Sequence, residues 1–198
     1  MNLNIHEAFG EKEVTPFFKA DYIASRDLFL QKSHCLDTIN SEHQCWKLLP
    51  EIVATPDLNL AIDVVWLGAA DAKKVLVLVS GTHGVEGFCG SAIQSFTLHA
   101  LQQSWLVLPV DTAILLIHAL NPWGMHWARR CDHQGIDINR NFIDFQHRPH
   151  LDPRYGDVLA ALVDANATNR ALTMRKLARQ FGQRDFEQIF SGGQFEYH

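Results

Sequence analysis

The sequence predicts an α/β protein, a three-layer α/β/α sandwich around a mixed, largely parallel sheet. Residues 73–80, KKVLVLVS, form a continuous β-branched and leucine run, which is typical of a strand buried on both faces. Residues 112–119 form a second such run, and a helix-like stretch, residues 91–103, lies between them. This strand–helix–strand order favours two parallel neighbouring strands.

The other elements are predicted from caps and periodicity. Thr15 is a candidate cap for a first helix that runs to about Ser33. Residues 58–67 alternate as a strand, with one expected apolar face made of Leu58, Leu60, Ile62, Val64 and Trp66. Helices are expected over residues 155–164 and 170–181, with no closing strand or helix after them. At 198 residues the chain fits one domain or a large part of a larger one.

Composition excludes several classes of function. The net charge of −5 gives no electrostatic footprint for nucleic acid or an anionic membrane, so neither is an expected partner. The longest apolar runs are of strand length, and the N-terminus lacks the pattern of a secretory signal. The four cysteines form no CxxC pair, which favours reduced and mostly buried thiols in a cytoplasmic protein.

His83 and Glu86 follow the first buried-type strand at a spacing of three. An imidazole and a carboxylate placed in this way on a turn can share one Zn²⁺, since two histidines and a glutamate form a known hydrolytic zinc site. The alternative is a hydrogen-bonded histidine beside a solvated glutamate at a helix start. Glycines at three-residue intervals around the pair favour the metal, because they permit a tight turn and close approach.

A second group of candidate residues follows the next strand, within residues 121–142. Arg140 offers a planar fork and Asn139 an amide donor, which together suit a substrate carboxylate. Arg129 or Arg130 could stabilise an oxyanion. The alternative is a solvated basic loop that is paired with nearby aspartates. If the two strands are parallel, both loops lie at the same edge of the sheet.

The motifs resemble those of the zinc metallocarboxypeptidase superfamily. GTHGVEG resembles its zinc-binding GxHxxE, and NPWG with GIDINRNF is similar to its NPxG and GVDLNRNF segments, in the same order. HGVEGFCGS, the paired arginines after NPWG and the late GGQ-aromatic segment resemble a bacterial carboxypeptidase-like branch of unknown function. That branch is related to the aspartoacylase and succinylglutamate desuccinylase group.

The resemblance implies a role for each matching residue. His83 and Glu86 would be ligands of a Zn²⁺ cofactor, and Arg130 would be the catalytic residue that holds the oxyanion. Asn139 and Arg140 would bind the substrate's terminal carboxylate. The implied reaction is hydrolysis of an amide bond next to a free carboxylate, in a small peptide or an N-acyl amino acid.

The resemblance also implies an incomplete site. The superfamily requires a third ligand, a histidine on a later strand, and a glutamate general base beyond it. His147 and His150 are expected in a solvent-facing loop, and His198 is the terminal residue. The resemblance therefore implies that residues 1–198 form a single carboxypeptidase-like catalytic domain that is incomplete at its C-terminal end, with only the N-terminal half to two-thirds of the fold present. The alternative function is that of a truncated, non-catalytic chain, with self-association through the sheet edge left open after its last strand.

Overall fold

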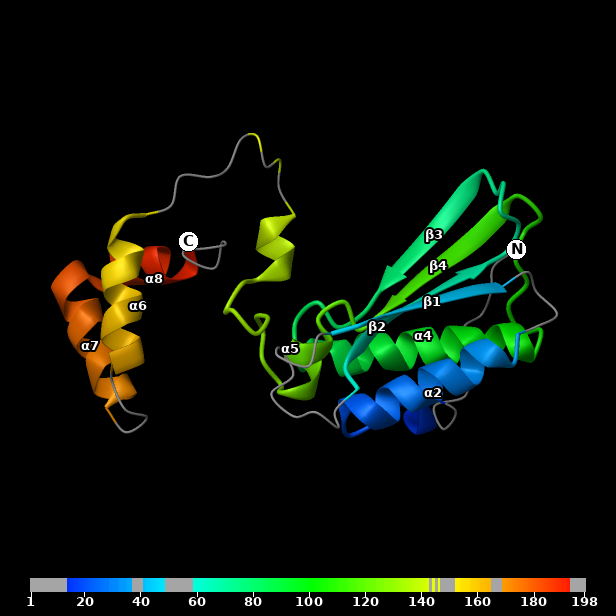
Figure 1. Cartoon of the computed structure of the whole chain (residues 1–198), viewed down its shortest axis with the longest axis horizontal. Coiled ribbons are helices and arrows are strands. Elements are labelled where there is room, and N and C mark those ends of the chain that lie inside the picture. Colours follow the sequence, from blue (N-terminus) through cyan, green and yellow to red (C-terminus); the bar gives the residue numbers. More distant parts are fainter. Residues whose placement is uncertain are drawn as a thin grey trace. The chain divides into compact units, whose positions relative to one another are not determined.

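A computed structural model describes residues 14–36, 41–48, 59–142, 144, 146, 152–164 and 169–192. Its contacts form two compact units, Met1–His133 and Gln134–His198, and each unit is described separately below. Figure 1 labels the elements.

The first unit contains a four-stranded sheet and most of the helices around it. Its elements are the 3-10 helix η1 (Thr15–Phe17), α2 (Tyr22–His34), β1 (Ser41–Lys47), β2 (Ala61–Leu67), β3 (Lys74–Val79), α4 (Glu86–Gln102), β4 (Thr112–His118) and α5 (Pro122–His126). The elements of the second unit are η2 (Ile138–Asn141), α6 (Arg154–Asp164), α7 (Arg170–Phe181) and α8 (Gln183–Gly192).

The sheet has the strand order β1-β2-β4-β3. β3 pairs with β4 in parallel, from Lys74 opposite Thr112 to Val79 opposite Ile117, as the strand–helix–strand order predicted. The other two pairs, β1 with β2 and β2 with β4, are antiparallel. The α/β class and the mixed sheet are thus confirmed, but the expectation of a largely parallel sheet is wrong. Only β3 and β4 are joined by a helical crossover, which parallel pairing requires.

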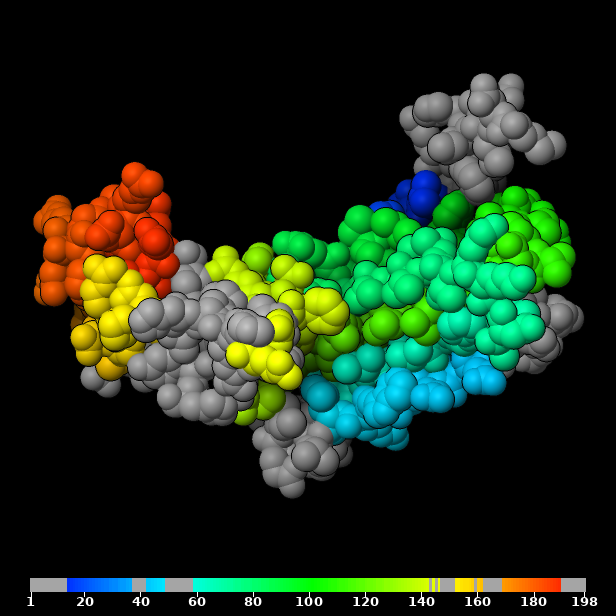
Figure 2. Space-filling view, turned by 90° about the horizontal axis from the view of Figure 1, so that it is seen from above, coloured from blue at the N-terminus to red at the C-terminus, as the bar shows by residue number. Residues whose placement is uncertain are grey.

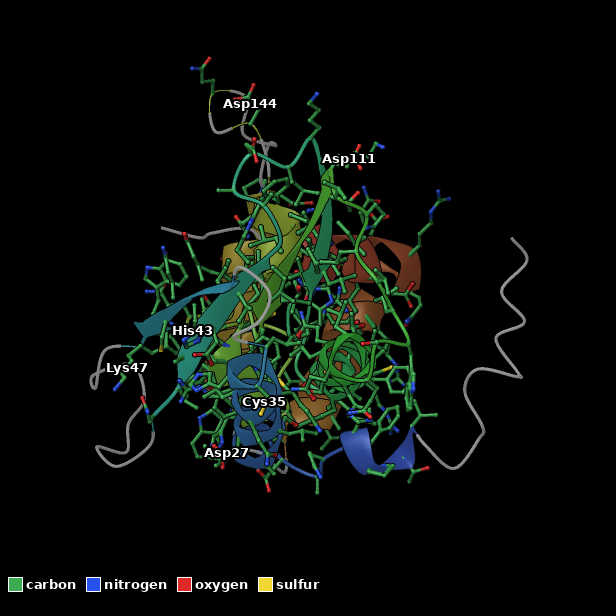
Figure 3. The ribbon with its side chains drawn as sticks, turned by 90° about the vertical axis from the view of Figure 1, so that its right-hand side faces the viewer. Asp27, Cys35, His43, Lys47, Asp111 and Asp144 are labelled. Atoms are coloured by element: carbon green, nitrogen blue, oxygen red, sulfur yellow. The ribbon has the colours of Figure 1, made fainter. Side chains whose placement is uncertain are left out.

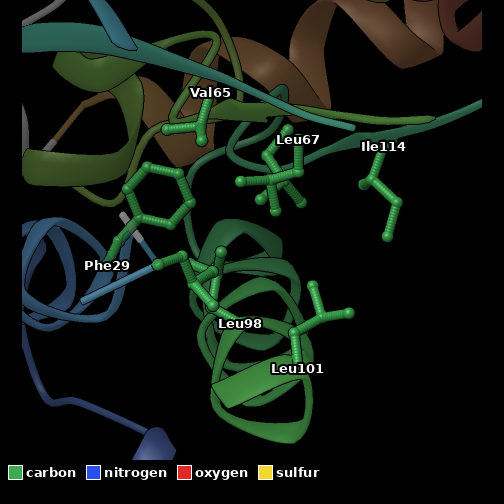
Figure 4. Close-up of a cluster of buried hydrophobic side chains, with 8 residues drawn as sticks. Phe29, Val65, Leu67, Leu98, Leu101 and Ile114 are labelled. Atoms are coloured by element: carbon green, nitrogen blue, oxygen red, sulfur yellow. The ribbon is translucent and has the colours of Figure 1, made fainter. Parts of the chain in front are cut away.

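Helices α2 and α4 pack on the same face of the sheet (Figure 1). The core between these helices and the sheet is apolar and buried, and Figure 4 shows part of it. The buried residues are Phe29, Leu36, Val65, Leu67, Leu98, Leu101, Ile114 and Leu116. The buried positions of β2 are the odd ones, so Ile62, Val64 and Trp66 do not form the buried face that the alternation predicted.

The opposite face of the sheet carries the remaining apolar side chains. Val75, Val77 and Val79 of β3 are 44%, 49% and 46% exposed, so the prediction of a strand buried on both faces is wrong. Figure 2 is seen from this side, and atoms of the strands lie at the surface. Among the described residues of the first unit, no helix covers this face, and the third layer of the sandwich stays a prediction. β3 is exposed because it lies at the edge of the sheet.

Several boundaries and environments differ from the predictions. The first long helix begins at Tyr22 and is capped by Asp21, whose carboxylate accepts from the amide of Ala24; Thr15 instead opens η1. α7 was predicted correctly, but α8 follows it where no closing helix was expected. The cysteines are free as predicted, yet Cys35, Cys45 and Cys89 are exposed rather than buried. The described part of the chain includes no helix long and apolar enough to cross a membrane.

The second unit has a small core of its own. Val158 from α6 packs with Phe186 and Ile189 from α8, and partly buried side chains of α7 complete the cluster. This helical packing explains why α8 forms: its buried positions are spaced three apart on one face.

Candidate functional site

The loops that follow β3 and β4 leave the sheet side by side. The amide of Leu120 donates to the carbonyl of Ser80 at 2.8 Å, and the amide of Asn121 donates to the carbonyl of Gly81 at 2.9 Å. The hydrogen bonds continue the parallel pairing past the ends of both strands. The expectation that these loops begin at one edge of the sheet is therefore confirmed for residues 80–81 and 120–121.

A buried glutamine of α4 fixes this edge. The amide nitrogen of Gln94 donates to the carbonyls of Leu78 in β3 and Ile117 in β4, at 2.8 Å and 3.0 Å. Its carbonyl oxygen accepts from the hydroxyl of Ser80 at 2.8 Å, and that hydroxyl accepts from the amide of Ala119. One side chain thus holds both strand ends against the helix.

His83 and Glu86 lie together at the start of α4. Nδ1 of His83 is 3.6 Å from Oε2 of Glu86, within the separation of about 4 Å that shared ligation of one ion requires. The side chain of His83 is 13% exposed and that of Glu86 is 75% exposed. The histidine is thus mostly buried, whereas the carboxylate faces solvent. Glu86 is also the first residue of α4, where the helix dipole favours a carboxylate.

Arg130 lies near the same carboxylate. Its Nη1 is 4.0 Å from Oε1 of Glu86, with the arginine side chain 48% exposed. Gly84 packs against the backbone of the residue that precedes Arg130, because a Cβ there would lie 2.4 Å from the backbone oxygen of Arg129. Its φ of +26° is also one that residues with side chains rarely adopt. The glycine at this position therefore has a packing role as well as a conformational one.

Asn139 and Arg140 belong to the second unit, where a buried aspartate organises them. The carboxylate of Asp137 accepts from the amides of Asn139 and Arg140 at 3.0 Å and 3.4 Å. Nε of Arg140 lies 3.6 Å from the other oxygen of Asp137. Asp137 thus orients the turn that carries both residues. We expected Arg140 to share a cleft with His83. The two residues belong to different units, so this expectation stays a prediction.

Among the described residues, the side chains that could bind a metal ion do not make up a complete site. His83 and Glu86 converge, but no group of three His, Cys, Asp or Glu side chains that could hold an ion occurs among the described residues. His147, His150 and His198 lie outside those residues. The two donors present fit one side of a zinc site and fall short of the three ligands that a catalytic zinc needs.

A second polar cluster lies between the sheet and the helices, and its residues were not among the candidates from the sequence. Nε2 of His118 is 2.9 Å from the hydroxyl of Ser91, and its ring stacks on Phe29 with centroids 4.5 Å apart. Asp63, directly opposite His118 in the β2–β4 register, is buried and bonds Nε of Arg26 at 2.6 Å. A charged residue inside the apolar alternation of residues 60–67 was the signal in the sequence.

Burial governs the protonation of this cluster. It lowers the pKa of His118 to about 4, because no water stabilises the imidazolium. Burial alone would raise the pKa of Asp63, but the hydrogen bond and the charge of Arg26 outweigh it and hold that pKa below its ordinary value. His118 is therefore neutral and Asp63 charged near pH 7. Both are sealed from solvent, which rules out contact with a substrate in this conformation.

A hollow lies at the other end of the sheet from the candidate site. Its volume is about 480 Å³, and its lining comes from the ends of α2 and α4, the turn after β2, the loop before β4 and the start of β4. Cys35, labelled in Figure 3, is one of the lining residues. None of the candidate site residues lines it. The candidate site is thus identified by its side chains and not by this cavity.

Comparisons with known proteins give one informative match. A family described as "Protein of unknown function (DUF2817)" matches residues 18–198. Among solved structures, cytosol aminopeptidase from Coxiella burnetii is similar over 52% of this chain and 28% of that chain, at 13% identity and a TM-score of 0.33. The chain thus spans less than a third of that protein, and the likeness is too distant to carry an argument. No curated protein matches the chain.

Proposed function

The chain belongs to the DUF2817 family, whose function is unknown, and from that premise we propose that it carries part of the site of a zinc-dependent metallocarboxypeptidase-type hydrolase. The substrate class is a small peptide or an N-acyl amino acid, cleaved at an amide bond next to a free carboxylate. The supporting observation is the 3.6 Å approach of His83 and Glu86 at the end of a parallel strand. Ligand sites in open α/β sheets lie at such strand ends.

Each residue of the site has one role in this proposal. His83 and Glu86 provide two ligands to Zn²⁺, which when bound supplies a Lewis acid and an acidified water. Arg130 binds the oxyanion that develops on the scissile carbonyl. Asn139 and Arg140 bind the terminal carboxylate, and Asp137 positions them through their backbone amides.

The second candidate is a non-catalytic chain that keeps only part of the zinc and substrate site. The absence of a third donor among the described residues favours it. On this proposal the 198-residue chain binds zinc weakly and below one ion per chain, with little or no peptidase activity. One tightly held zinc per chain with robust turnover would contradict it, and His198 would then be the first residue to mutate.

Zinc titration by calorimetry tests the proposed metal site. We expect His83→Ala and Glu86→Gln each to weaken zinc binding by about tenfold or more, since each removes one of two donors. His133→Ala, which changes an exposed histidine of the same unit, is the matched control. If both site variants bind zinc as the unchanged chain does, the metal role of the pair is refuted.

Ligand titration tests the proposed carboxylate site. Arg140→Ala is expected to weaken binding of an N-acetyl amino acid by roughly 2–5 kcal/mol if the charge pair is buried. The corresponding amide, which lacks the negative charge, is expected to bind the variant and the unchanged chain alike. Equal losses for both ligands, measured by NMR titration, would count against this role.

The compartment in this proposal is the cytoplasm. Free cysteines, three of them exposed, suit a reducing environment.

A further inference from the structure

The segment between β4 and Arg130 meets the loop after β3 at both of its ends. At its start, the amide of Asn121 donates to the carbonyl of Gly81 at 2.9 Å. At its end, the backbone of Arg129 lies against Gly84, where a Cβ would be 2.4 Å from its oxygen and 2.9 Å from its nitrogen. Arg130 follows directly, so the path of this segment determines where the arginine side chain leaves the backbone.

Asn121 holds this segment together from inside. The residue is 2% exposed and caps α5, with its Oδ1 accepting from the amide of Gly124 at 2.8 Å. The carbonyl of Gly124 in turn accepts from the amide of Arg129 at 2.7 Å. Two hydrogen bonds, with Gly124 between them, thus connect the side chain of Asn121 to the backbone that precedes Arg130.

The amide nitrogen of Asn121 adds a packing contact to the same segment. Among the described residues this nitrogen, Nδ2, is buried and makes no hydrogen bond. It lies 2.3 Å from the position that a Cβ on Gly124 would occupy, and the carbonyl oxygen of Arg129 lies 2.7 Å from that same position. A carbonyl is a favourable neighbour for an unpaired N–H group, so this arrangement favours the observed position of Arg129.

The backbone on either side of this turn is held in a conformation that is rarely adopted. Ala119 has a φ of +55° and Ala128 has a φ of +52°, in the left-handed region that residues with a Cβ seldom occupy. Such conformations persist only where surrounding contacts enforce them. The hydrogen bond between Gly124 and Asn121 lies between these two positions, so it is one of the contacts that enforce this path.

We propose that Asn121 is a positioning residue for Arg130. Its side chain holds the preceding backbone so that Nη1 of Arg130 stays 4.0 Å from Oε1 of Glu86. This inference rests on the proposed function, in which Arg130 binds the oxyanion and Glu86 binds the ion. A group that stabilises an oxyanion must be in place before the reaction, and a misplacement of about 1 Å can lower the rate by about a hundredfold.

NMR of the Arg130 side chain tests this role without metal or substrate. The Nε–H resonance of Arg130, assigned by its loss in Arg130→Gln, is expected to shift in Glu86→Gln, because the facing negative charge is removed. In a chain that carries Asn121→Gly, the same Glu86→Gln substitution is expected to leave the resonance unshifted. Glycine costs little at a helix cap, so this variant is expected to fold, and circular dichroism checks it.

Two further variants separate positioning from stability. Asn121→Ser keeps an acceptor for the amide of Gly124, so it is expected to restore the shift caused by Glu86→Gln. Asp21→Ala removes the carboxylate that caps α2 and is the matched control. It is expected to lower the stability of the chain but to keep the full shift.

Four outcomes would each overturn the proposal. They are a full shift in Asn121→Gly, no recovery in Asn121→Ser, an equal loss in Asp21→Ala, and an unshifted resonance when Glu86→Gln is introduced into the otherwise unchanged chain. Since the signals are recorded without zinc, they are independent of the zinc titration that tests the proposed function. If His83→Ala leaves zinc binding unchanged while the Arg130 resonance behaves as expected, the proposed function fails and the positioning of Arg130 stands.

Discussion

His118 and His83 stand at the ends of two neighbouring parallel strands, yet their surroundings give them different chemistry. His118 points toward the helices, is buried and bonds Ser91. His83 lies in the loop beyond its strand, is partly exposed and approaches the carboxylate of Glu86. Burial around His118 disfavours a positive charge, whereas the carboxylate beside His83 would favour a nearby cation. Strand-end position alone therefore does not distinguish the two histidines; access to solvent and a carboxylate partner make His83, and not His118, the candidate ligand.

Ser91 and His118 show how a hydrogen bond can mislead. A hydroxyl 2.9 Å from an imidazole has the geometry of a nucleophile and its base. Both side chains are sealed in the core, where Phe29 stacks on the imidazole ring. The pair therefore contributes to the stability of the sheet–helix interface.

The largest expected effect on stability comes from a substitution in the buried cluster around His118. Arg26→Ala leaves the buried carboxylate of Asp63 without its guanidinium, and we expect a loss of about 3–5 kcal/mol in the free energy of unfolding. Urea denaturation measures it. Lys74→Ala removes an exposed ion pair with Asp111 and is the control, with no measurable change expected. Equal effects of the two substitutions would contradict the role of burial.

Acidification is expected to have the next largest effect, through His118. Its pKa of about 4 in the folded chain lies below the ordinary value of 6.5, so the unfolded chain takes up the proton first. Stability is then lost as the pH falls from 6.5 to 4, by roughly 3 kcal/mol in total. His118→Phe should remove this part of the slope of unfolding free energy against pH. His133→Phe, at an exposed position, should keep it.

A smaller effect is expected at the loop that holds His83. Gly84→Ala forces a methyl group against the backbone of Arg129, and we expect a loss of about 1–3 kcal/mol. Gly135 also has a positive φ, +84°, but a Cβ there would meet nothing within 4 Å, so Gly135→Ala measures the cost of a positive φ without a close contact. A thermal melt of both variants separates the two causes. Loss no greater at Gly84 than at Gly135 would exclude a role for the close contact.

The smallest effect on stability is expected for a substitution beside the exposed carboxylate of Glu86. Arg130→Gln removes an ion pair at 4.0 Å between two exposed groups, so the unfolding free energy should change by about 0–1 kcal/mol. If zinc and Arg130 compete for Glu86, zinc affinity should rise, though by less than about tenfold. Zinc affinity that falls in this variant would contradict the competition.

The sequence predicted the parts of the fold that depend on local pattern. The parallel pairing of β3 with β4 and the bounds of α7 followed from apolar runs and helical periodicity. The convergence of His83 and Glu86 followed from spacing on a turn. Each of these needs only residues that are close in sequence or joined by one helix.

The remaining features depend on contacts between distant segments, which periodicity does not contain. The burial of Asp63 requires Arg26 from α2, and the exposure of β3 results from its place at the edge of the sheet. β1 escaped prediction because SEHQCWK has a polar composition and forms a strand only by pairing with β2. Asp63 within residues 60–67 was the one visible sign of a buried ion pair.

Gln94 has a mechanical consequence for the candidate site. Its amide joins α4 to Leu78 of β3 and Ile117 of β4, so these hydrogen bonds oppose relative motion of the helix and both strand ends. If His83 and Glu86 bind an ion as proposed, spreading the strands or sliding the helix would break them. Adjustment would then fall to the exposed side chains of Glu86 and Arg130, through rotamer changes rather than backbone motion.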